Sequence, residues 1–317
     1  MLPHWTPGRA AMWHIRDRQS EWNFMPALEP ALYPEHAVPF EDDFSLSDFP
    51  TVPPSGTPKG KTLKKELKQL VGQLHELQRK LYADGRHSVL TVFQAVDAAG
   101  KDGTIRKVFS GVNPTGFRTS AFEAPSGRER KHDFLWRCQR ALPMRGKIGI
   151  FNRSHYEEVL VVRVKPALLA AQRLPNVNSD TVWDERLESI RDWEKHLARN
   201  GVVIVKFWLN LSRTEQRKRL LARIERPEKN WKFDAADLDE RLLWDDYMHA
   251  YAEALAATSR PHAPWYAIPA DYKPYMRVAV ARIMVHTLQN LDMAYPEPSA
   301  EHLELLETGR QRLLDQK

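Results

Sequence analysis

Residues 91–104, TVFQAVDAAGKDGT, constrain the fold more than any other stretch of the chain. An apolar run at 89–93 precedes a series of small residues, and Gly100-Lys101 then leads into a helix-compatible segment at 105–110. A strand, a tight loop and a helix in this order are typical of a phosphate-binding loop, whose backbone N–H groups, helix N-terminus and lysine face an anion. The predicted phosphate contacts are Ala98, Ala99, Gly100, Lys101, Asp102 and Gly103.

The loop departs from the usual phosphate-loop pattern at two positions. Ala95 stands where the pattern has its first glycine, and Asp102 stands where it has a serine or threonine. Because that hydroxyl normally contacts a magnesium ion, Asp97, an acid inside the loop, becomes the first candidate for the metal ligand. The alternative interpretation is an ordinary strand-to-helix turn that contains a Gly-Lys pair.

The composition describes a globular chain with a basic surface. Lys and Arg number 47 and Asp and Glu number 41, so the net charge is +6. This positive charge favours a polyanionic partner, although a solvated surface with an excess of lysine explains the charge equally well. The single cysteine, Cys138, excludes an internal disulfide and a cysteine-based zinc site. Because the sequence shows no basic-then-apolar leader and no long apolar run, we expect a soluble, cytoplasmic protein without a membrane partner.

Apolar runs and helical periodicities alternate along the chain. The apolar runs predict strands at residues 89–93, 117–122, 147–152, 159–164, 202–209 and 265–268. Amphipathic spacing and capping signals predict helices at 63–85, 105–110, 126–142, 181–200, 234–258, 273–293 and 301–314, and another that begins at Ser212. This alternation predicts an α/β fold with a doubly wound parallel sheet, helices on both faces, and ligands beyond the carboxyl ends of the strands.

The two ends of the chain differ from its centre. Residues 1–60 are rich in proline and aromatics, including Trp5, Trp13 and Trp22. We expect an extended arm and linker that pack on the body or on a second subunit, with a partly disordered leader as the alternative. Residues 61–295 then form the main domain, with a lid at about 213–247, and residues 296–317 form a C-terminal helical extension. The aromatic arm favours a homo-oligomer.

Positive charge is concentrated at three places that suit phosphoryl transfer. Lys101 lies in the loop, Arg153 follows the strand at 147–152, and residues 213–232 carry eight basic residues against three acidic ones. Pro227 breaks that last segment, which includes Arg223, and a broken basic segment after a late strand is typical of a lid over phosphates. A solvated, highly charged helix face is the alternative.

Two further motifs bear on the ligand. Asn152 occupies the strand-end place that an acid holds in many nucleotide-binding enzymes, which again shifts the metal to Asp97; a plain turn residue is the alternative. Asp133 and Arg137 are four residues apart on one face of the helix predicted at 126–142. They either hold an acceptor nucleotide or form a surface ion pair of little energetic weight.

Six sequence blocks occur in order: AVDAAGKDGTIRKV, SGVNPTGF, HDFLWR, IGIFNRSHYEEVLVVRV, PEKNWKF with LWDDY, and APWY with a following PAD. Over about residues 60–295 the chain resembles the polyphosphate kinase 2 family, and within it the branch of polyphosphate:AMP/ADP phosphotransferases. The resemblance implies a P-loop kinase core similar to thymidylate kinase, with a helical lid. It also implies transfer of a terminal phosphoryl group between inorganic polyphosphate and a nucleotide, with Mg²⁺, or alternatively Mn²⁺, as the cofactor.

The resemblance further implies roles for single residues. Asp97 organises the metal and the acceptor phosphate, and Lys101 and Arg153 contact the transferring phosphates. Many members of the family have Asp-Arg-Ser where this chain has Asn152 before Arg153, and the subgroup with FNRS is associated with AMP as well as ADP. On the acceptor side the resemblance implies a role for Arg137, and the implied polyphosphate contacts include Arg106, Lys107, Arg223, Lys229 and Lys232. Asp133, Asn152 and Glu157 are further candidate contacts to the nucleotide from their places in the sequence.

The leading hypothesis is therefore a polyphosphate-dependent nucleotide kinase that converts AMP and ADP into ADP and ATP, with GDP as a further candidate acceptor. Glu157, beside the FNRS cluster, is either a residue that selects the acceptor or a surface glutamate. Two other functions stay open: an ATP-dependent nucleoside monophosphate kinase of the same fold, and a non-catalytic P-loop module that binds polyanions. No nucleic-acid partner is expected.

Overall fold

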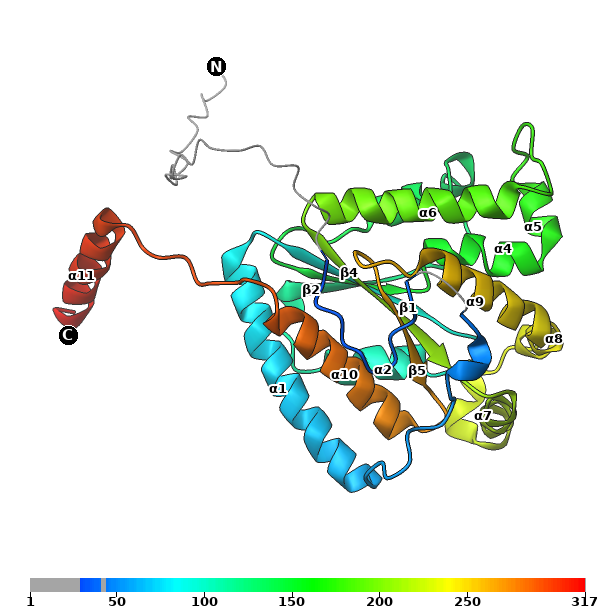
Figure 1. The fold of residues 1–317 in the computed structure, drawn as a ribbon. Coiled ribbons are helices and arrows are strands. Elements are labelled where there is room, and N and C mark those ends of the chain that lie inside the picture. The colour runs from blue at the N-terminus through cyan, green and yellow to red at the C-terminus, as the bar shows by residue number, and fades with distance from the viewer. Residues whose placement is uncertain (1–28, 41–43, 317) are drawn as a thin grey trace, which may run out of the picture.

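The structure, a computed structural model, describes residues 29–40 and 44–316, and its centre is a five-stranded parallel sheet (Figure 1). The strands are β1 (Ser88–Gln94), β2 (Phe117–Ala121), β3 (Ile148–Asn152), β4 (Val202–Asn210) and β5 (Trp265–Pro269), in the order β2-β3-β1-β4-β5. β1 and β4 are buried at every position, which explains why most of their residues are apolar. Every pairing between neighbouring strands is parallel, so the predicted sheet is confirmed.

Helices cover both faces of this sheet. α1 (Gly60–Asp84), α2 (Lys101–Val108) and α10 (Lys273–Gln289) lie on one face, and α6 (Val182–Arg199) and α9 (Trp244–Thr258) lie on the other (Figure 1). A hydrophobic core lies on each face of the sheet, and alternate residues of a strand point into one core or the other. Val203 and Val205 of β4 pack under the first group of helices, and Ile204 packs under the second. The chain runs outward from β1 to β2, returns to β3 and crosses to β4 on the other side of β1. The strand order therefore reverses at β1, whose carboxyl end is the expected ligand site.

Shorter elements connect and cover this framework. After β4 come α7 (Arg213–Glu225), the 3₁₀ segment η5 (Pro227–Lys232) and α8 (Ala236–Leu242), which lie beyond the carboxyl end of the sheet (Figure 1). The remaining elements are η1 (Leu46–Asp48), η2 (Pro114–Gly116), η3 (Glu129–Lys131), α3 (Trp136–Arg140), η4 (His155–Glu158), α4 (Val161–Val164), α5 (Pro166–Ala171) and the longer C-terminal α11 (Ala300–Leu314).

The continuous helix predicted at 126–142 is wrong. The structure has the single turn η3 and the five-residue helix α3 in its place. The capping signal is real but local, because the backbone N–H of Ser126 donates to the Glu129 carboxylate at 3.3 Å. Gly127, at φ +48°, takes a left-handed conformation in what would be the first turn of the predicted helix, so no continuous helix can start there.

The strand predicted at 159–164 is also wrong, because these residues enter α4. η4 turns the chain away from the sheet directly after β3, so the β-branched residues have no strand to pair with, and tertiary context overrides their propensity. The helix predicted at 234–258 is interrupted at Leu243, which separates α8 from α9.

The described part of the N-terminal arm lies along the outer edge of β5. The backbone N–H of Val38 donates to the Trp265 carbonyl oxygen at 2.9 Å, and that of Ala267 donates to the His36 carbonyl oxygen at 2.8 Å. This segment therefore covers a sheet edge that would otherwise be open to pairing with another chain. Trp5, Trp13 and Trp22 lie outside the described residues.

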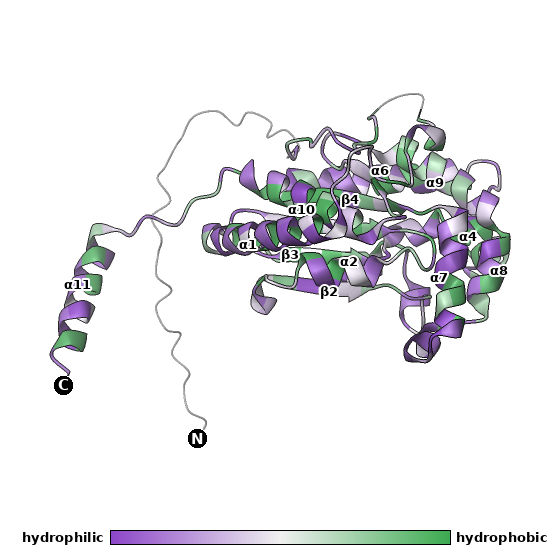
Figure 2. Cartoon of the chain, turned by 90° about the horizontal axis from the view of Figure 1, so that it is seen from below, coloured by the Kyte–Doolittle hydropathy of each residue, from purple (hydrophilic) through white to green (hydrophobic). Residues whose placement is uncertain are grey.

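At the other end of the chain, α11 stands apart from the body (Figure 2). Its leucines, such as Leu303 and Leu306, are exposed. Of the helices in residues 29–40 and 44–316, none combines the length and the apolar character needed to cross a bilayer.

Candidate active site

The loop predicted to bind phosphate, which we call the phosphate loop, occupies residues 95–100, between the end of β1 and the start of α2. Ala98 and Gly100 have φ values of +61° and +102°, left-handed conformations that curl the chain into a tight turn. The ammonium group of Lys101 donates to the Ala95 carbonyl oxygen at 2.7 Å and so links the two ends of the loop. The N-terminus of α2 adds partial positive charge at the same place.

Arg153, directly after β3, meets Asp97 of the loop that follows β1. Nη2 of Arg153 donates to Oδ1 of Asp97 at 3.1 Å, and the backbone of Arg153 has φ +61°. Beside this pair, Nδ2 of Asn152 donates to Oδ1 of Asp102 at 2.7 Å. Because β1 and β3 are neighbours in the sheet, the structure brings the predicted residues Asp97, Lys101 and Arg153 into one site.

The larger hollow at this site, which we call the phosphate pocket, has a volume of about 650 Å³. Its walls come from the phosphate loop, the ends of β2 and β3, α7, η5 and the start of α10. Three acids face into it, Asp97, Asp102 and Glu123. Its nine basic residues are Lys101, Arg106, Arg153, Arg219, Arg223, Lys229, Lys232, Lys273 and Arg277. Such an excess of positive charge suits a ligand with several negative charges in a row.

Three of these basic residues, Arg219, Lys273 and Arg277, were not predicted from the sequence. Arg219 is buried on α7 and donates to the carbonyl oxygens of Ala99 and Ala270, each at 2.7 Å, so it ties the phosphate loop to the end of β5. Lys273 and Arg277 lie one turn apart on α10, which packs against α2. No motif marks these residues, because only the packing of α7 and α10 directs them to the site.

A smaller hollow of about 240 Å³, which we call the aromatic pocket, adjoins the phosphate pocket. Trp244, Tyr247 and Tyr251 of α9 form part of its wall, and their spacing on one helical face is the sequence signal that could have revealed it. Its other lining residues include Leu160, Val161, Gln216 and the acids Glu157, Asp234, Asp237 and Glu240. Asp97 and Arg153 line both pockets, so their ion pair forms the boundary between a cationic and an acidic, aromatic cavity.

The charged groups at this boundary shift one another's pKa values. Burial raises the pKa of Glu157, although Arg153 and Lys101 oppose the shift. Burial alone would lower the pKa of Arg153, but the negative charges of Glu157 and Asp97 outweigh it and raise that pKa. Desolvation lowers the pKa of Lys101, against the opposing charge of Asp97. Arg153 is thus a permanent cation held between two carboxyl groups.

Three predicted site residues line neither the phosphate pocket nor the aromatic pocket. Lys107 is exposed on α2. Asp133 begins the turn into α3, where its Oδ1 accepts two backbone N–H groups at 2.9 and 3.1 Å. Arg137 donates to the Glu123 carbonyl oxygen at 2.5 Å, so it lies behind the wall of the phosphate pocket.

The oxygen atoms of the phosphate pocket suit a hard divalent cation. Asp97, Asp102 and Asn152 bring carboxylate and amide oxygens to its lining. Mg²⁺ usually binds through one or two carboxylates, water and substrate phosphates, so a sparse protein ligand set fits it. Across residues 29–40 and 44–316, no group of three or more His, Cys, Asp or Glu residues is arranged to hold a metal ion alone. The phosphates of a substrate would therefore have to complete the coordination.

Comparison with known proteins agrees with this geometry. The model of the family Polyphosphate kinase 2 matches residues 58–296. The chain is 54% identical over 251 residues to the ADP-polyphosphate phosphotransferase of Rhodopseudomonas palustris, and the aligned region covers 78% of this chain and 86% of that protein. It is 49% identical over 226 residues to the AMP/ADP-polyphosphate phosphotransferase of Meiothermus ruber, covering 71% and 81% of the two chains. The crystal structure of polyphosphate kinase 2 from Arthrobacter aurescens has a similar fold, with a TM-score of 0.77 and 36% identity over 89% of this chain and 100% of that one.

Proposed function

Since the chain belongs to the polyphosphate kinase 2 family, we propose that it transfers the terminal phosphoryl group of inorganic polyphosphate to AMP or ADP. The observation that carries this proposal is the Asp97–Arg153 ion pair, at 3.1 Å, on the boundary of the two pockets. A polyphosphate chain has one negative charge on each internal phosphate, which matches the run of cations in the phosphate pocket. A nucleoside, with an aromatic base and hydroxyl groups, matches the aromatic pocket.

In this arrangement the reacting phosphates meet at the ion pair. An oxygen of the acceptor phosphate attacks the terminal phosphorus of polyphosphate, a new P–O bond forms, and the bond to the rest of the chain breaks. Lys101 and Arg153 stabilise the charge on the transferring group, together with the backbone N–H groups of the phosphate loop. Arg223, Lys229 and Lys232 hold the polyphosphate chain from the lid, which consists of α7, η5 and α8.

The acceptor end of the reaction involves the carboxyl groups. Asp97 faces both pockets and is the residue that would bind Mg²⁺, with Asp102 and Asn152 as nearby oxygen ligands. When bound, the ion would supply positive charge that offsets the negative charge of the substrate phosphates. Glu157, Asp237 and Glu240 accept hydrogen bonds from the ribose or from amino groups of the base, because carboxylates recognise such donors and repel phosphate.

The decisive experiment is an acceptor panel with polyphosphate as the sole donor. AMP, ADP and GDP are incubated separately with the protein, long-chain polyphosphate and Mg²⁺, and the products are separated by anion-exchange chromatography. Formation of ADP from AMP and of ATP from ADP supports the proposal and defines the acceptor range.

One control reaction and one binding measurement address the alternative functions. AMP with ATP as donor, and no polyphosphate, tests an ordinary nucleoside monophosphate kinase; product in that reaction alone overturns the assignment of polyphosphate as the donor. Retention on immobilised polyphosphate without any turnover would instead indicate a binding module.

A further inference from the structure

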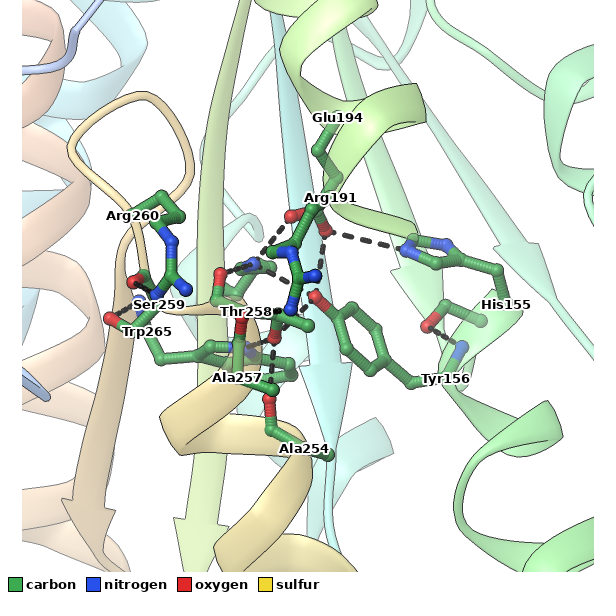
Figure 3. Close-up of polar contacts among 12 residues, drawn as sticks. His155, Tyr156, Arg191, Glu194, Ala254, Ala257, Thr258, Ser259, Arg260 and Trp265 are labelled. Carbon is green, nitrogen blue, oxygen red and sulfur yellow. Dashed lines mark hydrogen bonds and ion pairs between the residues drawn. The ribbon is translucent and has the colours of Figure 1, made fainter. Parts of the chain in front are cut away.

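A cluster of buried polar side chains lies between the sheet and α6 (Figure 3). At its centre is Lys206 of β4, whose side chain is 0% exposed. Its ammonium group donates to the Glu194 carboxylate at 2.6 Å, to the Tyr156 hydroxyl at 2.8 Å and to the Thr258 carbonyl oxygen at 2.8 Å. All three N–H donors of the lysine are therefore used inside the protein.

Tyr156 connects this cluster to the site. Its hydroxyl donates to Glu194 at 2.9 Å, accepts from Lys206 and lies 2.8 Å from the Thr258 hydroxyl. The three partners come from α6, β4 and α9, so the end of the tyrosine side chain is fixed by three separate elements. The Tyr156 ring also packs edge-on against Trp265 of β5, with 4.8 Å between ring centroids.

The backbone on either side of Tyr156 carries residues that face the substrates. Arg153 stands three positions before it and lines both pockets, and Glu157 follows it directly and lines the aromatic pocket. At the start of η4, the Ser154 hydroxyl accepts from the Tyr156 backbone N–H at 3.2 Å and from Gln94 of β1 at 3.1 Å. Glu194, Lys206 and Thr258 are buried and line neither the phosphate pocket nor the aromatic pocket, so any effect that they have on the reaction has to pass through η4.

We propose that the buried network of Lys206, Glu194 and Tyr156 is a positioning device, which fixes η4 and thereby holds Arg153 and Glu157 at the angle needed for phosphoryl transfer. This inference rests on the proposed function of the site. A buried ion pair is a poor source of stability, because desolvation offsets its Coulombic attraction and apolar residues of similar size often stabilise a protein as well. A buried ion pair at this place is therefore better explained by the geometry that it imposes on η4. Displacement of a reacting group by about 1 Å can lower turnover roughly 10²-fold.

The test separates stability from turnover. Lys206→Met leaves the Glu194 carboxylate buried without its cation and should lower the melting temperature strongly. The double variant Lys206→Met/Glu194→Met removes both charges and leaves the Tyr156 hydroxyl its partner Thr258, so we expect much of the melting temperature to return. If the network positions η4, the kcat for ADP phosphorylation in the double variant stays at least tenfold below that of the wild type. The polyphosphate KM stays within about twofold, since the other cations of the phosphate pocket are unchanged.

Tyr156→Phe provides a second, milder test, because it removes the hydroxyl and leaves the ion pair. We expect kcat to fall about three- to tenfold with little loss of melting temperature. Tyr266→Phe is the matched control: Tyr266 is buried on β5 toward the opposite core, and its hydroxyl accepts the Tyr33 backbone N–H at 3.2 Å. That variant should retain the kcat of the wild type.

A double variant that regains kcat together with its melting temperature would show that the network is only structural and would overturn the proposal. If the double variant does not fold, Tyr156→Phe decides, and a kcat equal to that of the wild type again overturns it. The wild-type protein assayed in parallel keeps the two inferences apart: an inactive wild type contradicts the proposed function, whereas an active wild type with equally active variants contradicts the positioning role alone.

Discussion

The guanidinium group of Arg153 lies 3.1 Å from the Asp97 carboxylate, and these two residues line both the cationic phosphate pocket and the acidic aromatic pocket. They come from the ends of neighbouring strands, β3 and β1, so the sheet itself sets their separation. The pair is partly exposed, and its importance lies in its place between the two pockets and not in its contribution to stability.

The first prediction concerns the coupling of this pair. Asp97→Asn and Arg153→Lys should each lower kcat roughly 10²- to 10³-fold, because each removes charge or geometry that the transition state requires. The fall in kcat of the double variant should be much smaller than the product of the falls in the two single variants. This difference corresponds to a coupling free energy of about 1–3 kcal/mol. The measurement is kcat at saturating polyphosphate and ADP for all four proteins. Strictly additive effects would mean that the two residues act independently.

The second prediction separates catalysis from binding at Lys101. Lys101→Ala should lower turnover roughly 10²- to 10³-fold, because this ammonium group lies in the phosphate loop where charge develops. Retention of the variant on a polyphosphate column should change only modestly, since eight other basic residues line the pocket. Equal loss of turnover and retention would favour a binding module over an enzyme.

The third prediction assigns the two pockets to the two substrates. Tyr247→Leu should raise the KM for ADP about five- to tenfold, because it removes an aromatic wall and a hydroxyl that donates to Glu240 at 2.5 Å. Lys229→Met should raise the KM for polyphosphate several-fold and leave the KM for ADP nearly unchanged. The two variants control for each other in steady-state assays. If Tyr247→Leu raised the KM for polyphosphate and Lys229→Met raised the KM for ADP, the assignment of the substrates to the two pockets would be reversed.

Sequence patterns were sufficient for the centre of this fold. The apolar runs of β1, β3 and β4 and the loop with Asp97 and Lys101 predicted a parallel sheet with a phosphate site at its carboxyl end. Arg153 could be added because the ends of parallel strands meet at one edge. These features depend on local order along the chain, which a sequence displays directly.

The errors and omissions arise where packing decides. Residues 159–164 include four valines but find no strand to pair with, so the chain enters a helix at Val161. Arg219, Lys273 and Arg277 line the phosphate pocket only because α7 and α10 pack beside the loop, and no spacing in the sequence shows this. Tyr247 and its aromatic neighbours on α9 repeat at helical spacing, so the sequence does contain a signal for them. The acidic residues around them make this segment resemble a solvent-exposed helix instead of a pocket wall.

The fourth prediction concerns Arg219, which holds the phosphate loop from behind. It is buried and donates to backbone carbonyl oxygens of Ala98, Ala99, Ala270 and Asp271. Arg219→Met leaves several of these acceptors without their donor, so the free energy of unfolding should fall by roughly 2–4 kcal/mol, and the KM for polyphosphate should rise. Urea denaturation and steady-state kinetics check the two effects. The exposed Arg217 on the same helix is the control, and Arg217→Met should behave as the wild type in both measurements.

The last prediction is a pH dependence of polyphosphate binding. Desolvation in the phosphate pocket, together with the positive charges of Arg219, Arg277 and Lys229, lowers the pKa of Lys273 to about 8. The protonated form of Lys273 attracts the polyanion, so binding weakens as the pH rises through that value in the free protein. The KM for polyphosphate should therefore be flat below about pH 7 and rise about three- to tenfold between pH 7 and 9.

Polyphosphate and its metal complexes also titrate near neutral pH, so Lys273→Arg is the necessary control for this effect. Arginine keeps its charge up to pH 9, and its variant should show a nearly flat KM over the same range. Lys273→Met should have a raised KM at every pH and an equally flat profile, because the group that titrates is gone. The difference between the wild-type and the Lys273→Arg profiles then isolates the lysine. If Lys273→Arg keeps the full rise in KM above pH 7, the titration belongs to the substrate, and Lys273 does not control the affinity for the chain.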